Sequence, residues 1–205
     1  MSFPTQLTVL RILLVPVFYV LFAVVEPAQM FWAGLVFLIA ALSDWYDGYV
    51  ARRYNSVTAL GAFLDPLADK LLTSTALIAF AAMDLVPMWM VLIVVARDIY
   101  LTVFRIVADN MRKPVKTSSS AKVKTFLQMA FIGYVLIALI MRDGTIGQPA
   151  AQLALTLLED STLYVLISML TLITVWTAVQ YTYDNWSVWR SATRRYIFRR
   201  SPQKL

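Results

Sequence analysis

The sequence predicts an all-α integral membrane protein with six transmembrane helices, and three observations support this fold class. The 205 residues are 60% hydrophobic and 15% charged, with a mean hydropathy of +0.69, whereas a soluble domain is about 45–50% apolar and about 25% charged. The apolar residues gather in six stretches that approach the length of about 20 residues needed to span a bilayer. The segments between these stretches alternate between basic and acidic, as loops on opposite sides of a membrane do.

The six predicted spans form one membrane domain over residues 1–205. In chain order they are Leu7–Val25, Met30–Val50, Leu60–Met83, Met88–Ala108, Val123–Met141 and about Leu163–Tyr183. Arg11 stands near the start of the first span, where its side chain either snorkels to the membrane surface or serves a polar site. An amphipathic piece around Ala150–Leu158 is expected to lie on the membrane surface.

Charge in the connecting segments predicts the orientation of the chain. Basic residues fill the segments after the second and fourth spans and the tail of about residues 184–205, whereas acidic residues mark the other connections. Basic loops remain in the cytoplasm, so six spans place both termini on the cytoplasmic side of the cell membrane. The tail is expected to anchor this topology and to contact anionic lipid headgroups.

The absence of two residue types narrows the chemistry. The chain has no cysteine and no histidine, which excludes disulfides, thiol nucleophiles, imidazole bases and Cys or His metal sites. Acid–base or metal chemistry must therefore use carboxylates, whose oxygens suit hard ions such as magnesium, manganese or calcium.

Acidic residues in or beside the apolar stretches are the main candidates for a site. They are Asp44, Asp47, Asp65, Asp69 and Asp98. A charge at the bilayer centre costs at least about 2.5–3.5 kcal/mol, so such groups face a cavity, a partner or a metal. Asp44 and Asp47 share one face of the second span, and Asp65 and Asp69 share one face of the third. A short loop joins these spans, so the four carboxylates lie within reach of each other and repel unless cations neutralise them.

Ion pairing with Arg52, Lys70 or Arg97 is the competing explanation for these acids. The helical spacing of four carboxylates indicates one or two bound hard metal ions rather than ion pairing alone. Gly48 and Gly61 lie on or near the same helix faces, where glycine permits the close approach of a bulky ligand, although either one could also serve helix packing.

The spacing of these residues resembles a known family signature. The chain reads Asp44-x2-Asp47-Gly48-x2-Ala51-Arg52-x8-Gly61-x3-Asp65-x3-Asp69, which is similar at every fixed position to the signature of the CDP-alcohol phosphotransferase family. Further stretches resemble the branch of phosphatidylglycerophosphate synthases, over roughly residues 3–132. They are Pro4-x3-Thr8-x2-Arg11, Leu60–Lys70, Ala96–Asp98 followed by Arg105, and Lys122–Thr125 followed by Gln128. Thr5 departs from the family, which usually has Asn there.

The resemblance implies six transmembrane helices, a homodimer, and two divalent metal ions, Mg²⁺ or Mn²⁺, in a polar cavity at the cytoplasmic side. It implies that the metals are held by Asp44, Asp47, Asp65 and Asp69. Asp69 would also be the general base, a role that a chain without histidine leaves to a carboxylate. The residues implied to border the CDP nucleotide are Asp44, Gly48, Ala51, Arg52 and Gly61.

Four cations are candidates for binding a phosphate on the acceptor alcohol: Arg97, Arg105, Lys122 and Lys124. Arg97 and Arg105 stand eight residues apart in one span, so both can point into one cavity. We expect Asp98 to orient Arg105 rather than to bind a metal. Lys122 and Lys124 have an alternative role as anchors of the membrane topology.

The resemblance implies transfer of the phosphatidyl group of CDP-diacylglycerol to glycerol 3-phosphate, giving phosphatidylglycerophosphate and CMP. A cardiolipin synthase of the same family, with phosphatidylglycerol as acceptor, is the alternative, and inositol phosphate or serine are further acceptors. A cation transporter would explain the aspartates, but it would not explain the other signature residues or a site at one membrane edge. Membrane lipids are expected partners, and nucleic acid is not.

Overall fold

The computed structural model describes residues 3–24, 26–54, 59–115, 119–142 and 146–196, and within them it contains α-helices and no strands. The all-α prediction is confirmed for these residues. The helices are α1 Phe3–Ala23, α2 Pro27–Tyr54, α3 Ala59–Ala82, α4 Met88–Asn110, α5 Ser119–Met141, α6 Gln148–Leu157, α7 Asp160–Asp184 and α8 Trp186–Tyr196. The side chains of residues 44–45, 47–54, 59–66 and 69 are among those that the description does not include.

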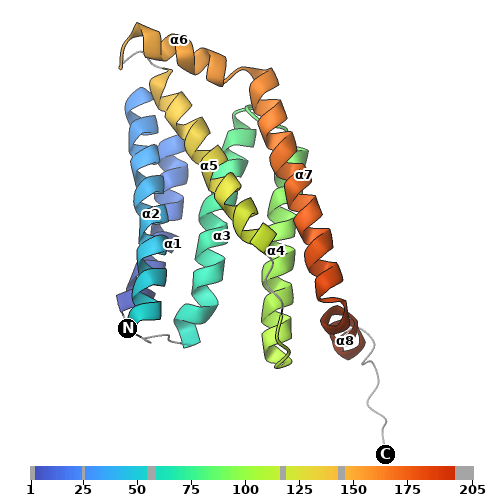
Figure 1. Ribbon diagram of the computed structural model, residues 1–205. Helices are drawn as coiled ribbons and strands as arrows, with labels where there is room; N and C mark the ends of the chain where they lie inside the picture. Colours follow the sequence, from blue (N-terminus) through green and yellow to red (C-terminus); the bar gives the residue numbers. More distant parts are fainter. Residues whose placement is uncertain (1–2, 25, 55–58, 116–118, 143–145, 197–205) are drawn as a thin grey trace, which may run out of the picture.

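The long helices run lengthwise in one bundle (Figure 1). They are α1, α2, α3, α4, α5 and α7, and successive members alternate in direction. α6 crosses one end of the bundle, whereas α8 lies at the other end, which is also the end where α1 begins. α1 packs against α2 and α3, α4 packs against α3 and α7, and α5 contacts α2, α3 and α7.

Aromatic side chains hold α1, α2 and α3 together. Phe18 and Phe22 of α1 are buried. The ring centroid of Phe18 lies 5.8 Å from that of Phe37 on α2, and the ring centroid of Phe22 lies 5.6 Å from that of Phe80 on α3. Such pairs contribute about 0.5–1.5 kcal/mol beyond their buried area. This packing keeps α2 beside α3, the two helices that carry the signature aspartates.

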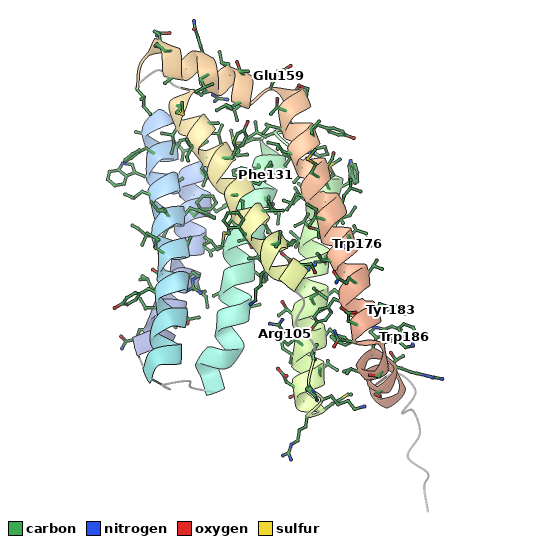
Figure 2. The ribbon with its side chains drawn as sticks, viewed as in Figure 1. Arg105, Phe131, Glu159, Trp176, Tyr183 and Trp186 are labelled. Atoms are coloured by element: carbon green, nitrogen blue, oxygen red, sulfur yellow. The ribbon has the colours of Figure 1, made fainter. Side chains whose placement is uncertain are left out.

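The outer surface of the bundle is strongly apolar. On α7, Leu172, Trp176 and Val179 are 70%, 69% and 61% exposed, and Figure 2 labels Trp176 on this helix. Soluble monomers rarely expose large contiguous apolar patches. Among the described residues, three stretches are long and apolar enough to cross a bilayer: Gln6–Ala23, Ser120–Met141 and Asp160–Asp184. These features are those of an integral membrane protein.

The predicted number of six spans remains a prediction. The apolar parts of α2 and α3 that are described, Ala28–Ser43 and Lys70–Ala82, are shorter than a full span. α4 is long, but Arg97, Asp98 and Arg105 interrupt its apolar sequence.

The predicted amphipathic segment is confirmed as a helix, α6. The Oη atom of Tyr134 on α5 donates a 2.7 Å hydrogen bond to the carbonyl oxygen of Leu157, at the last residue of α6. This bond ties α6 to the end of α5 and satisfies one of the carbonyl groups that a helix end leaves without a partner.

α8 was not predicted, because residues 184–205 appeared only as a basic tail. Asn185 makes the turn that begins it. The Nδ2 atom of Asn185 donates to the carbonyl oxygen of Tyr181 at 2.9 Å. The backbone carbonyl oxygen of Asn185 accepts from the backbone N–H groups of Val188 and Trp189. Trp186 and Trp189 then stack with ring centroids 5.1 Å apart.

Gly34 on α2 offers a test of the packing between α2 and α5. A Cβ atom at Gly34 would lie 2.9 Å from the Cδ1 atom of Ile140, whereas one at Gly133 would meet none of the described atoms within 4 Å. Alanine in place of a helical glycine stabilises by up to about 1 kcal/mol, so Gly133→Ala should raise the midpoint of thermal unfolding in detergent. Gly34→Ala should raise it less or lower it. Adding Ile140→Val, which removes the contacting methyl, should restore the gain; an equal rise in both alanine variants would contradict the close contact.

Candidate active site

The four signature aspartates belong to two helix ends that are neighbours. α2 runs unbroken through Asp44 and Asp47, and α3 carries Asp65 and Asp69 within its first three turns. Figure 1 shows both ends at the end of the bundle where α1 begins, and α2 and α3 contact each other. Their side chains lie outside the described set, as do those of the other signature positions. The metal, base and nucleotide assignments therefore stay predictions for Asp44, Asp47, Gly48, Ala51, Arg52, Gly61, Asp65 and Asp69.

The donors on these two helix ends fit hard divalent ions. Carboxylate oxygens are the ligands that Mg²⁺ and Mn²⁺ take in proteins. Positions 44 and 47 on α2, and 65 and 69 on α3, are about one helical turn apart, the spacing at which residues share a helix face. Among the side chains that the structure describes, no group of three or more acidic, His or Cys residues is placed to hold a metal.

Arg11 does not snorkel to the membrane surface. Its side chain is fully buried, and its Nε atom donates a 3.4 Å hydrogen bond to the carbonyl oxygen of Ala40 on α2. Ala40 precedes Asp44 by four residues, or about one turn of α2. A positive charge from α1 therefore lies beside the part of α2 that leads into the signature.

A cluster of buried charged and polar side chains joins α4, α5 and α7. We call it the Asp98 cluster, and its members are Arg97, Asp98, Lys124, Gln128 and Thr177. The Oδ1 atom of Asp98 accepts hydrogen bonds from Nη1 of Arg97 at 3.0 Å and from Nζ of Lys124 at 2.6 Å. Lys124 also donates to Oε1 of Gln128, and Nη2 of Arg97 donates to Oγ1 of Thr177 at 2.8 Å. Every member is at most 9% exposed.

Positive charge exceeds negative charge in this cluster. Arg97 and Lys124 share the single carboxylate of Asp98, and Lys70 of α3 is close enough to interact electrostatically with both Asp98 and Lys124. Lys70 directly follows Asp69 in the chain, so the cluster lies near the signature end of α3. Ionised groups within a membrane segment are costly and are functional candidates for that reason.

The Asp98 cluster also retains unused hydrogen-bonding capacity. The Oδ2 atom of Asp98, the Nε atom of Arg97 and the Nε2 atom of Gln128 are buried and have no hydrogen-bond partner within the described structure. Buried polar groups are nearly always paired in folded proteins. Cations in excess together with unpaired N–H groups are what a site for an anion offers.

The four cations predicted to bind an acceptor phosphate separate into two pairs. Arg97 and Lys124 come together in the Asp98 cluster, whereas Arg105 and Lys122 are exposed. Arg105, labelled in Figure 2, lies about two turns further along α4. The expectation that Asp98 orients Arg105 is wrong, because Asp98 accepts its hydrogen bonds from Arg97 and Lys124 instead.

Gln128 and Thr177 were not among the predicted site residues, although each had a signal in the sequence. Gln128 follows Lys124 by four residues, which places both on one helix face. Thr171, Thr174 and Thr177 recur every three residues in the middle of α7, and all three are buried. This periodicity marks a polar stripe, but the partner of Thr177, Arg97, stands 80 residues earlier in the chain.

Comparison with known proteins identifies relatives along most of the chain. The sequence profile of a family described as CDP-alcohol phosphatidyltransferase matches residues 1–189. A relative from Bacillus subtilis (strain 168) is 36% identical over 148 residues, which covers 66% of this chain and 77% of the relative. One from Escherichia coli (strain K12) is 36% identical over 141 residues, covering 66% and 76%, and one from Rickettsia bellii is 35% identical over 136 residues, covering 66% and 75%. All three are named CDP-diacylglycerol–glycerol-3-phosphate 3-phosphatidyltransferase.

Two threonines on α7 test the energetics of the Asp98 cluster. Thr177→Val keeps the side-chain shape but removes the acceptor of an Arg97 hydrogen bond; a hydrogen bond to a charged group contributes about 1.5–3 kcal/mol. We therefore expect a lower midpoint of thermal unfolding in detergent. Thr174→Val is the matched control, because it removes a buried hydroxyl oxygen without a hydrogen-bond partner in the described structure, and it should be neutral or stabilising. Equal losses in the two variants would contradict this difference.

Proposed function

We propose that this chain, which belongs to the CDP-alcohol phosphatidyltransferase family, transfers the phosphatidyl group of CDP-diacylglycerol to glycerol 3-phosphate. The three relatives described above carry the name of this activity. Within the chain itself, the observation that most favours it is the Asp98 cluster. Its buried excess of cations near the signature end of α3 suits an acceptor that carries a phosphate.

In the proposed reaction, a hydroxyl oxygen of glycerol 3-phosphate forms a bond to the β-phosphorus of CDP-diacylglycerol. The bond between that phosphorus and the bridging oxygen breaks, so that CMP leaves and phosphatidylglycerophosphate remains. Asp69 takes the proton of the attacking hydroxyl as general base, since the chain has no histidine for this role.

The signature residues supply the rest of the proposed site. Two divalent ions, Mg²⁺ or Mn²⁺, would be held by Asp44, Asp47, Asp65 and Asp69. Such ions neutralise a diphosphate and the charge that develops on it during the transfer. Arg52 would bind a phosphate oxygen pair through its guanidinium fork. The nucleotide would be bordered by Asp44, Gly48, Ala51, Arg52 and Gly61.

Arg97 and Lys124 are the proposed ligands of the acceptor phosphate, with Arg105 and Lys122 at the exposed approach to it. A phosphate monoester carries a charge of about −1.5 to −2 at pH 7, which matches the excess of positive charge around Asp98. Phosphatidylglycerol, the acceptor in the cardiolipin synthase alternative, is a diester with a single negative charge. The charge of the cluster therefore favours glycerol 3-phosphate.

We also propose that α1, α2, α3, α4, α5 and α7 cross the cell membrane, with both termini in the cytoplasm. These helices run lengthwise (Figure 1). Arg112 and Lys113 follow α4 at the end where α8 lies, whereas Asp84 and Asp160 are near each other at the opposite end, where Figure 2 labels Glu159. Basic loops remain in the cytoplasm. A homodimer is the assembly that the family resemblance favours.

Release of CMP by the purified chain in detergent tests the proposed function. With CDP-diacylglycerol and magnesium present, we expect release with glycerol 3-phosphate and not with phosphatidylglycerol, inositol 1-phosphate or serine. A chelator should stop the release, and added Mg²⁺ or Mn²⁺ should restore it. Release with phosphatidylglycerol alone would make the chain a cardiolipin synthase, and no release with any acceptor would overturn the catalytic assignment.

Substitution of single aspartates tests the roles within the signature. Asp69→Asn should abolish CMP release, because an amide cannot accept the proton, while binding of CDP-diacylglycerol stays largely intact. Asp44→Asn should weaken metal-dependent binding of CDP-diacylglycerol as well. Asp84→Asn, at the opposite end of the bundle, is the control and should retain both properties. Turnover near the wild-type rate in Asp69→Asn would refute its assignment as the base.

A further inference from the structure

Asp98 has no direct part in the proposed reaction, although it lies at the centre of the buried cluster. Its carboxylate is 2% exposed and receives hydrogen bonds from two cations on one oxygen atom. We propose, building on the function above, that Asp98 is a positioning residue whose Oδ1 atom holds Arg97 and Lys124 where they receive the phosphate of the acceptor.

Each of the two cations is held at two points. Arg97 donates to Asp98 on α4 and to Thr177 on α7, at 3.0 and 2.8 Å. Lys124 donates to Asp98 at 2.6 Å and to Gln128 on its own helix. Asp98 is the anchor that the two cations share, so it sets their position relative to each other as well as to the bundle.

Holding these side chains in place lowers the cost of binding a phosphate. Long Arg and Lys side chains lose rotamer entropy when they are ordered, and a ligand that had to order both of them would bind more weakly for that reason. Two like charges this close also repel each other unless an anion lies between them. Without Asp98, Arg97 and Lys124 would move apart while the acceptor site is empty.

Asp98 does not exhaust the binding capacity of the cations it holds. The Nε atom of Arg97 has no hydrogen-bond partner in the part of the chain that is described. A lysine ammonium has three donors, and Lys124 uses two of them in the cluster. Lys70 adds positive charge from the side of α3. Phosphate oxygens therefore find free N–H groups and a net positive charge, even with Asp98 ionised.

The competing role for Asp98 is a purely structural ion pair between α4 and α5. Removing one partner of such a buried pair is strongly destabilising, so a loss of stability cannot distinguish the two roles. If the pair were only structural, its loss would lower the fraction of folded enzyme. The maximal rate would fall, and the Michaelis constants of the two substrates would stay unchanged. A positioning residue instead acts on the Michaelis constant of the substrate whose phosphate the cations bind.

Steady-state CMP release by the full chain, with each substrate varied in turn, separates these roles. Asp98→Asn should raise the KM for glycerol 3-phosphate by about ten- to a hundredfold, as expected for misplaced binding groups, while the KM for CDP-diacylglycerol stays unchanged. Asp98→Glu, which restores the charge, should recover most of the loss. Thr171→Val is the control, because Thr171 is a buried α7 residue whose hydroxyl bonds only to the carbonyl oxygen of Ile167 among the partners described.

An unchanged KM for glycerol 3-phosphate in Asp98→Asn, with only a lower unfolding midpoint, would overturn the proposal. If Asp98→Asn does not fold, Thr177→Val and Gln128→Leu replace it, since each removes the second of the two contacts that hold Arg97 or Lys124. Each variant should raise the KM for glycerol 3-phosphate by a smaller factor than Asp98→Asn. An unchanged KM for glycerol 3-phosphate in both variants would also overturn the proposal. Failure of the function itself is distinguishable, because the wild-type chain would then release no CMP with glycerol 3-phosphate.

Discussion

A bilayer offers no water to buried polar groups, and this constraint governs the whole molecule. Backbone N–H and C=O groups must find partners within the chain, which makes helices the accessible structure for its apolar segments. Side-chain charges within those segments are costly and persist where they meet a counter-charge or a ligand. The Asp98 cluster is such a place, since Arg97 and Lys124 meet there on one carboxylate, and it lies near the end of α3 that carries two of the signature aspartates.

Packing and chemistry are divided between two groups of helices. The aromatic contacts of Phe18 and Phe22 hold α1 against α2 and α3, which keeps the four signature aspartates on neighbouring helices. Hydrogen bonds from Arg97 and Lys124 hold α4, α5 and α7 together around Asp98. Lys70 links the two groups, since it directly follows Asp69 and acts on Asp98. In the proposed reaction, the first group would bind the nucleotide and metals, and the second the acceptor.

Features that follow from local sequence were predictable. The lengths of the apolar stretches predicted the long helices, and the amphipathic pattern of residues 150–158 predicted α6. α8 has an amphipathic pattern as well, but its arginines indicated only a basic tail, and its first turn depends on Asn185 bonding back to Tyr181. Arg11 was ambiguous because a cation near the end of an apolar helix can either snorkel to the membrane surface or serve a polar site. Its burial and its hydrogen bond to Ala40 on α2 exclude snorkelling.

The sequence by itself determined the helical membrane architecture, the limitation to carboxylate chemistry, and the spacing that identifies the family, because each depends on composition or on positions within one or two adjacent helices. Only the tertiary structure decided which of the cations on α4 and α5 are buried together and which are exposed. Arg97 and Lys124 meet on Asp98, and Arg105 and Lys122 stay exposed. The reason is physical: helical periodicity says which residues share a face, but the partner of a face is set by how distant helices pack, and α4, α5 and α7 meet only in the folded bundle.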